Sequence, residues 1–171
     1  MSGSVRTCGG VLLVGIGNPD RGDDGFGPAV ANRFRGLAPP GVCVLECRGD
    51  VLDLMEEWEG FSAVIVVDAA APISRAGRVH RIDLACHPLP GEVARSSTHA
   101  FGVAEAVELA RSLGWLPRHL VAYLVEGEDF AIGAPLSPVV AKAVDEVVER
   151  IVTELSRISP AHREEGAAEH A

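Results

Sequence analysis

The segment at residues 11–27 reads VLLVGIGNPDRGDDGFG and decides the fold. Its first four residues are apolar and are followed by glycine, which is typical of a buried strand. The residues from Phe26 onward have the pattern of a helix. The loop between them therefore joins a strand end to a helix start, the position at which an open α/β sheet usually binds its ligand. Because the loop carries Asp20, Asp23 and Asp24, it favours a cation over a phosphate.

Strands and helices alternate along the rest of the chain. We expect strands at 42–47, 61–68, 77–84 and 119–126, and helices at 27–37, 51–58, 99–111 and from 138 onward. Segment 61–68 is a continuous apolar run, as in a central parallel strand, whereas 77–84 alternates apolar and polar residues, as at a sheet edge. The sequence thus predicts an α/β fold: a three-layer α/β/α sandwich with a mostly parallel sheet of about five strands and one antiparallel edge strand.

The remaining segments divide the chain into one domain and a tail. Residues 85–95 hold two prolines and a glycine and are expected to form a loop. Ser137 is expected to cap the last helix, with Pro138 in its first turn. The apolar residues that recur at helical spacing from Val139 onward are expected to face the core. We predict a single domain over residues 1–158. Residues 159–171 are small and polar, which predicts a disordered C-terminal tail.

Composition excludes several classes of protein. Of the 171 residues 47% are apolar, enough to fill one core, and the net charge of −9 opposes attraction to nucleic acid or anionic membranes. No window holds the roughly 18 apolar residues of a membrane helix, and no signal-like segment is apparent, so we expect a cytoplasmic protein. The four cysteines form no CxxC pair and are expected to be buried free thiols.

Candidate ligands meet at one end of the predicted sheet. Asp68 ends the central strand and His99 opens a helix, so both should lie beside the acidic loop. Two carboxylates and an imidazole suit a divalent transition ion. The helix N-terminus would favour the neutral, coordinating form of His99.

Each candidate also has a structural interpretation. Asp68 could be only a turn cap, His99 could be surface or packing, and at least one loop aspartate is expected to serve only as a cap. Spacing does not say whether Asp23 or Asp24 faces the ligand.

Other features of the sequence point to no second chemistry. A phosphate loop is disfavoured by Pro19 and the three aspartates, and no G-x-S-x-G nucleophile motif is present. The histidines outside the candidate set are expected to be structural. The acidic residues near 126–129 are expected to form a solvated loop, with a position flanking the cleft as the alternative. These residues are His80, His87, His119, Glu126, Glu128 and Asp129.

Four motifs together resemble the hydrogenase maturation endopeptidases. They are Gly17-Asn18, Asp23-Asp24-Gly25-Phe26-Gly27, Val66-Val67-Asp68-Ala69 and Ser97-Thr98-His99-Ala100-Phe101-Gly102. The resemblance extends from about Val11 through the segment at 136–140, and segment 71–77 does not strengthen it. It implies a soluble protease that removes a short C-terminal extension from the large-subunit precursor of a nickel-iron hydrogenase after nickel insertion.

The resemblance also implies the site. Asp24, Asp68 and His99 would be both metal ligands and catalytic residues, while Gly17, Asn18, Gly25 and Gly27 would shape the loop. The nickel would be presented by the precursor's cysteines, with other divalent transition ions able to occupy the site in vitro. The implied partner is the precursor, with no nucleic acid and no membrane insertion. A non-hydrolytic metallocentre-assembly chaperone using the same residues is the alternative.

Overall fold

Five strands form one sheet in the order β2-β1-β3-β5-β4. The structure, a computed structural model, describes residues 10–48, 51–96 and 100–158. The strands are β1 (Val11–Ile16), β2 (Val42–Cys47), β3 (Ala63–Ala70), β4 (Val79–Asp83) and β5 (His119–Glu126). All neighbouring pairs are parallel except β4 and β5, which are antiparallel at the sheet edge. The parallel strands therefore end together, at what we call the carboxyl edge.

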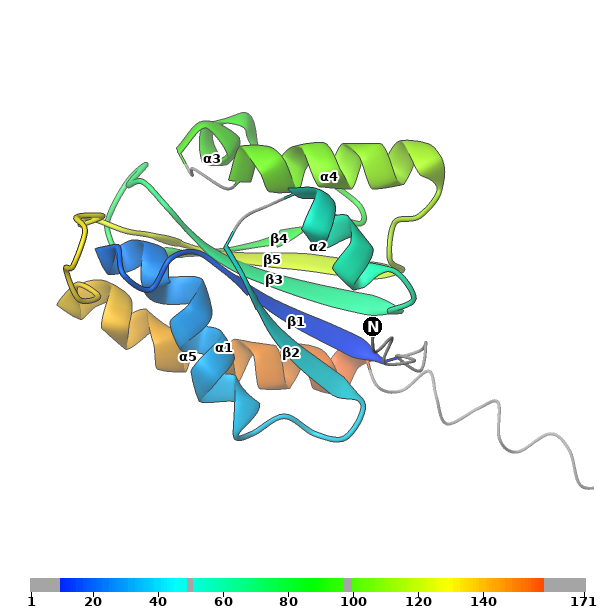
Figure 1. Cartoon of the computed structure of the whole chain (residues 1–171), viewed down its shortest axis with the longest axis horizontal. Coiled ribbons are helices and arrows are strands. Elements are labelled where there is room, and N and C mark those ends of the chain that lie inside the picture. Colours follow the sequence, from blue (N-terminus) through cyan, green and yellow to red (C-terminus); the bar gives the residue numbers. More distant parts are fainter. Residues whose placement is uncertain (1–9, 49–50, 97–99, 159–171) are drawn as a thin grey trace, which may run out of the picture.

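Helices cover both faces of the sheet (Figure 1). They are α1 (Phe26–Arg35), α2 (Val51–Trp58), α3 (Gly91–Ser96), α4 (Ala100–Leu113) and α5 (Pro138–Ile158), with a 3-10 turn, η1 (Gly22–Gly25), before α1. One buried cluster joins α1 and α5 to one face, and a second joins α2 and α4 to the other. The predicted three-layer α/β/α sandwich with one antiparallel edge strand is confirmed.

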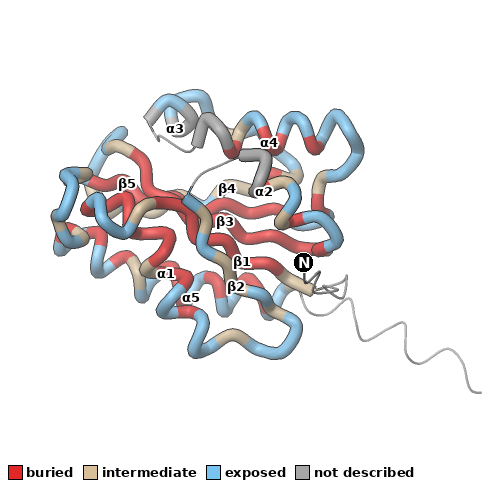
Figure 2. Tube along the Cα trace, in the orientation of Figure 1, coloured by how far each residue is buried: buried red, intermediate tan, exposed pale blue. Residues whose placement is uncertain are grey.

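The central strand explains why the sheet needs two helical layers. Every residue of β3 is buried, and Figure 2 shows the buried segments concentrated in the middle strands. Alternate β3 residues enter opposite clusters: Val64 and Val66 pack towards α2 and α4, whereas Ile65 and Val67 pack towards α1 and α5. The apolar run in the sequence is therefore the signature of burial on both faces.

Three local expectations are wrong. The segment predicted as a loop at 85–95 contains α3, which begins directly after Pro90 and carries Glu92 in its first turn, where a carboxylate favours a helix start. Cys43 and Cys86 are exposed rather than buried. Val139 was expected in the core of α5 but is 40% exposed.

Two predictions concern residues outside the described part of the chain. They are the burial of Cys8 and the disordered tail at 159–171. Within the part of the chain that the structure describes, no helix is long and apolar enough to cross a membrane.

Candidate active site at the carboxyl edge

The loop after β1 folds back onto Asp24, the third of its aspartates. Gly17 has a φ of +137°, and a Cβ at this position would collide with the backbone oxygen of Asp24. The next residue, Asn18, donates its backbone N–H to Asp24 Oδ2 at 2.9 Å. Its side-chain Oδ1 accepts the N–H of Asp20 at 3.0 Å. Gly17 and Asn18 thus bring the start of the loop against Asp24, which is only 7% exposed.

Two later glycines let α1 begin close to the sheet. A Cβ on Gly25 would lie 3.1 Å from the Cα of Pro19, and one on Gly27 would lie 2.6 Å from the backbone oxygen of Val67. Val67 directly precedes Asp68, so the start of α1 lies against the strand that carries this residue. The η1 turn also contacts β3. The acidic loop and Asp68 therefore belong to one region of the molecule.

Asp23 has a structural task that separates it from Asp24. Its carboxylate is fully buried and accepts three backbone N–H groups, from Glu128 at 2.8 Å, Asp129 at 3.1 Å and Ser137 at 2.7 Å. In addition, the Asp23 N–H donates to the backbone oxygen of Asp129. Asp23 therefore joins the first loop to the loop after β5. We call this set of hydrogen bonds the Asp23 clamp.

The clamp also changes the account of how α5 begins. Ser137 was predicted to cap this helix with its hydroxyl, but Ser137 Oγ is buried without a hydrogen-bond partner among the described residues. Its backbone N–H is instead accepted by Asp23, and its backbone oxygen accepts the N–H of Ala141. A residue from a distant loop thus satisfies one of the donors at the helix start.

Asp68 lies within β3 and is fully buried. Its Oδ1 accepts the N–H of Ala69 at 2.8 Å. Because side chains alternate along a strand, Asp68 shares the face of Val64 and Val66, which is covered by α2 and α4. Helix α4 ends just before the start of β5, at the end of the sheet opposite the carboxyl edge. Its first residue, Ala100, therefore lies at the carboxyl edge. Asp68 therefore faces the helical layer that contains α4, the helix whose first residue follows His99 in the sequence.

His99 itself lies outside the described residues, so the predicted triad with Asp24 and Asp68 stays a prediction. Among the residues that are described, no three His, Cys, Asp or Glu side chains are grouped closely enough to hold a metal ion.

Sequence reasoning missed Glu126, the last residue of β5. It was assigned to a solvated acidic loop, yet its side chain is fully buried. Its carboxylate accepts the N–H groups of three consecutive residues after β3, at 2.7 to 2.8 Å; these are Ile73, Ser74 and Arg75. His80, expected to be structural, places Nε2 2.7 Å from Glu126 Oε1. The position of Glu126 could have indicated its burial, because it ends a strand in which all the preceding residues except one are apolar.

Glu126 should make stability depend on pH in the acid range. Burial by itself would raise its pKa, but the hydrogen bonds from Ser74, His80 and Arg75 outweigh burial and lower the pKa from 4.5 to about 2. A lowered pKa in the folded state stabilises the protein fully above pH 4.5, and this contribution is lost as the pH falls towards 2. We expect a slope of up to about 1.4 kcal/mol per pH unit from this residue in that window.

The measurement is urea unfolding between pH 2 and pH 6. Glu126→Gln should be less stable at pH 6 and should lack this part of the acid-dependent loss. The same pH slope in the variant and the wild type would contradict the assignment.

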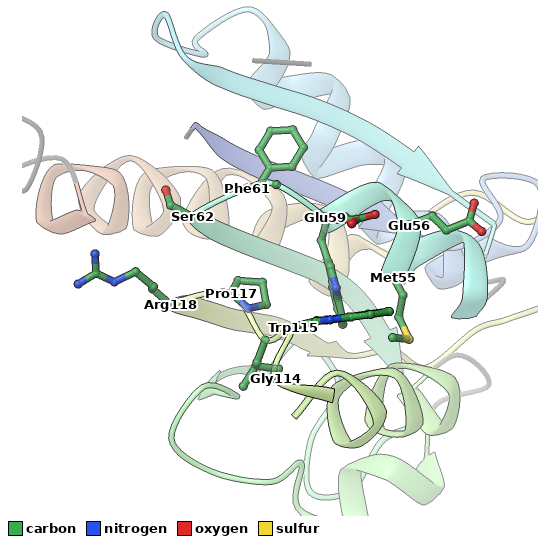
Figure 3. A pocket seen from close by; sticks show the side chains of 12 residues that line it. Met55, Glu56, Glu59, Phe61, Ser62, Gly114, Trp115, Pro117 and Arg118 are labelled. Atoms are coloured by element: carbon green, nitrogen blue, oxygen red, sulfur yellow. The ribbon is translucent and has the colours of Figure 1, made fainter. Parts of the chain in front are cut away.

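A pocket of about 330 Å³ lies at the other end of the sheet, where β3 and β5 begin (Figure 3). Its lining is mainly apolar and includes Trp58, Phe61 and the 66% exposed Trp115. Neither Asp24 nor Asp68 lines it. The pocket and the carboxylates are therefore separate features, and residues around the pocket offer control positions for experiments on the carboxyl edge.

Comparison with known proteins identifies the class. Residues 29–154 match the family model described as hydrogenase maturation protease. The chain is 31% identical over 133 residues to the hydrogenase expression/formation protein HupD of Bradyrhizobium diazoefficiens, covering 75% of this chain and 68% of that protein. It is 30% identical over 158 residues to a putative hydrogenase maturation protease of Methanocaldococcus jannaschii, covering 86% and 97%.

A solved structure agrees with the fold. The hydrogenase maturating endopeptidase HybD from E. coli superposes with a TM-score of 0.72 at 19% identity, over 88% of this chain and 94% of that one. The match to the family model and the two relatives place the protein in the hydrogenase maturation protease class. The chain belongs to the hydrogenase maturation protease family.

Proposed function

We propose that this protein is an endopeptidase that removes the C-terminal extension of a nickel-iron hydrogenase large-subunit precursor after nickel insertion. The observation that carries the proposal is the meeting of the Asp24 turn with the buried Asp68 strand, in a member of the maturation protease family. Asp24, Asp68 and His99 would bind the nickel held by the precursor's cysteines. The nickel is thus part of the substrate.

The chemistry of the two described carboxylates suits this task. Each is oriented by a backbone N–H, from Asn18 onto Asp24 and from Ala69 onto Asp68. Such hydrogen bonds commonly orient carboxylates that bind metals. Together with an imidazole nitrogen from His99, they would make a mixed oxygen and nitrogen donor set, which transition ions accept.

The protein's own part in the reaction is positioning and proton transfer. Holding the precursor at the carboxyl edge would keep the extension beside the catalytic groups, which lowers the entropic part of the barrier. Water attacks the carbonyl carbon of the cleaved amide, and a carboxylate takes a proton from that water. The carbon–nitrogen bond then breaks as the leaving nitrogen receives a proton. The metal in the substrate can share in activating the water.

The test compares two forms of one precursor. Purified protein is incubated with nickel-loaded and nickel-free large-subunit precursor from the same organism, and the intact mass of the precursor is measured. We expect the mass of the extension to be lost only from the nickel-loaded form, and His99→Ala to prevent that loss. Equal cleavage of both forms would remove the nickel-dependent step. Stable complex formation without any mass change would overturn the protease in favour of the assembly chaperone.

A further inference from the structure

Glu126 uses one buried carboxylate to hold the segment that follows β3. Its Oε2 accepts the N–H groups of Ile73, Ser74 and Arg75, and its Oε1 accepts the Ser74 hydroxyl at 3.0 Å. The backbone adds two bonds, from Gly77 N–H to the oxygen of Glu126 and from Glu126 N–H to the oxygen of Arg78. The connection between β3 and β4 is therefore bound to Glu126 twice, through residues 73–75 and through residues 77 and 78.

This arrangement exceeds what a connection between strands requires. Turn residues alone can reverse a chain, and Gly77, with a φ of +82°, already supplies such a position. Burying a carboxylate costs free energy unless its oxygens are well satisfied. An apolar residue at position 126 would avoid that cost but would leave three consecutive amides without their acceptor. The geometry thus favours a fixed shape for Ile73–Arg75.

The fixed segment lies beside the candidate site. It follows Asp68 by five residues, and β3 residue Ala70 pairs in register with Glu126. In Figure 1 the connection extends past the carboxyl edge, beside the loop that follows β5. A groove of about 590 Å³ adjoins it, lined in part by Arg75, Gly77 and Lys142.

The segment presents side chains outward while its amides face inward. Ile73 is 39% exposed and Arg75 is also exposed, whereas the amides of both residues donate to buried Glu126. Ile73 can contact an apolar side chain of a polypeptide, and Arg75 can bind a carboxylate or a carbonyl oxygen. The groove carries both signs of charge, since Glu128 and Glu146 line it together with Arg75 and Lys142, so it can bind both donor and acceptor groups of a polypeptide.

We propose that Glu126 is a positioning residue for precursor recognition, fixing Ile73–Arg75 beside Asp68 so that Ile73 and Arg75 contact the precursor polypeptide near the cleaved bond. This inference rests on the proposed protease function. A segment fixed before binding loses little conformational entropy when the precursor docks. The contribution of Glu126 should therefore appear in KM rather than in kcat.

The first experiment changes the two exposed side chains. Ile73→Ala and Arg75→Ala should each raise KM for the nickel-loaded precursor about fivefold or more, with kcat within about twofold, as expected for lost binding contacts. Leu113→Ala and Arg118→Ala are the matched controls. Both side chains are exposed and lie near the end of the sheet where β5 begins, away from the carboxyl edge. KM values unchanged in both segment variants would overturn the contact.

The second experiment tests the positioning with and without substrate. Glu126→Gln should speed amide hydrogen exchange of Ile73–Arg75 in the free protein by about tenfold or more, and should raise KM as the segment variants do. Glu154→Gln is the control, because Glu154 is another buried carboxylate, held by Arg81 and Tyr123 on the α5 side. It should leave both readouts at 73–75 unchanged.

The two levels of the proposal can fail separately. If wild-type protein does not cleave the precursor, the proposed function fails, while hydrogen exchange still decides whether Glu126 positions the segment. If wild-type protein cleaves and Glu126→Gln keeps both the exchange rate and KM, the positioning role is overturned.

Discussion

Asp68→Asn should reduce precursor cleavage by about 10²- to 10⁴-fold, the range of a lost general acid or base, while leaving the fold intact. Asn has nearly the same shape as Asp, and its amide oxygen can still accept the N–H of Ala69 that Asp68 Oδ1 accepts. The substitution therefore removes the negative charge while this hydrogen bond can be kept. A neutral amide is a poor proton acceptor and a weaker ligand for a cation, so both proposed roles of Asp68 would be lost together.

The measurement is the initial rate of extension loss, followed by intact mass, alongside urea unfolding of the same preparation. Asp145→Asn is the control: Asp145 is an exposed aspartate of α5 that pairs with Arg33 on the surface. This variant should cleave at the wild-type rate. Wild-type activity in Asp68→Asn would exclude Asp68 from the reaction, whereas a large loss of stability would leave its activity loss attributable to unfolding.

Asp23→Ala should destabilise the protein by several kcal/mol. The substitution leaves three backbone N–H groups without their acceptor: that of Ser137, which is buried, and those of Glu128 and Asp129, which are partly buried. Each unsatisfied buried group costs about 1–3 kcal/mol, and the losses are not fully additive because the two loops can relax. We expect a loss of about 3–5 kcal/mol in the free energy of unfolding.

Urea unfolding monitored by circular dichroism gives that free energy. The control is Asp145→Ala, which breaks an exposed ion pair and should cost less than about 1 kcal/mol. A loss of similar size in both variants would show that the Asp23 clamp contributes no more than a surface contact. Cleavage should also fall in Asp23→Ala, because the neighbouring Asp24 would lose its fixed surroundings.

The arrangement of strands and helices could be predicted because burial leaves periodic marks in the sequence. The unbroken apolar run of β3 indicated a central strand, and the alternation in β4 indicated an edge; both are confirmed. The helix α3 was missed because its six residues are too few to show a period. Prolines and glycine there are compatible with a loop as well as with a short helix start.

The resemblance assigned the ligand role to Asp24, but the structural task of Asp23 could not be predicted from residue spacing. Asp23 and Asp24 are adjacent and chemically identical, and only the path of the loop after β5 decides that Asp23 meets three amides. Glu126 was assigned to a solvated loop for a similar reason, since the segment that surrounds it is 51 to 53 residues distant in sequence. Contacts of this kind depend on tertiary structure and leave no local pattern.

The Asp23 clamp has a consequence for the order in which the protein matures on the ribosome. Asp23 and Ser137 are 114 positions apart, so the third hydrogen bond of the clamp cannot form until the chain has been synthesised through Ser137. A nascent chain that stops before Ser137 already contains Asp24 and Asp68 but lacks the bond that joins the acidic turn to the start of the last helix. The Asp23 clamp is thus completed only after all five strands have been made.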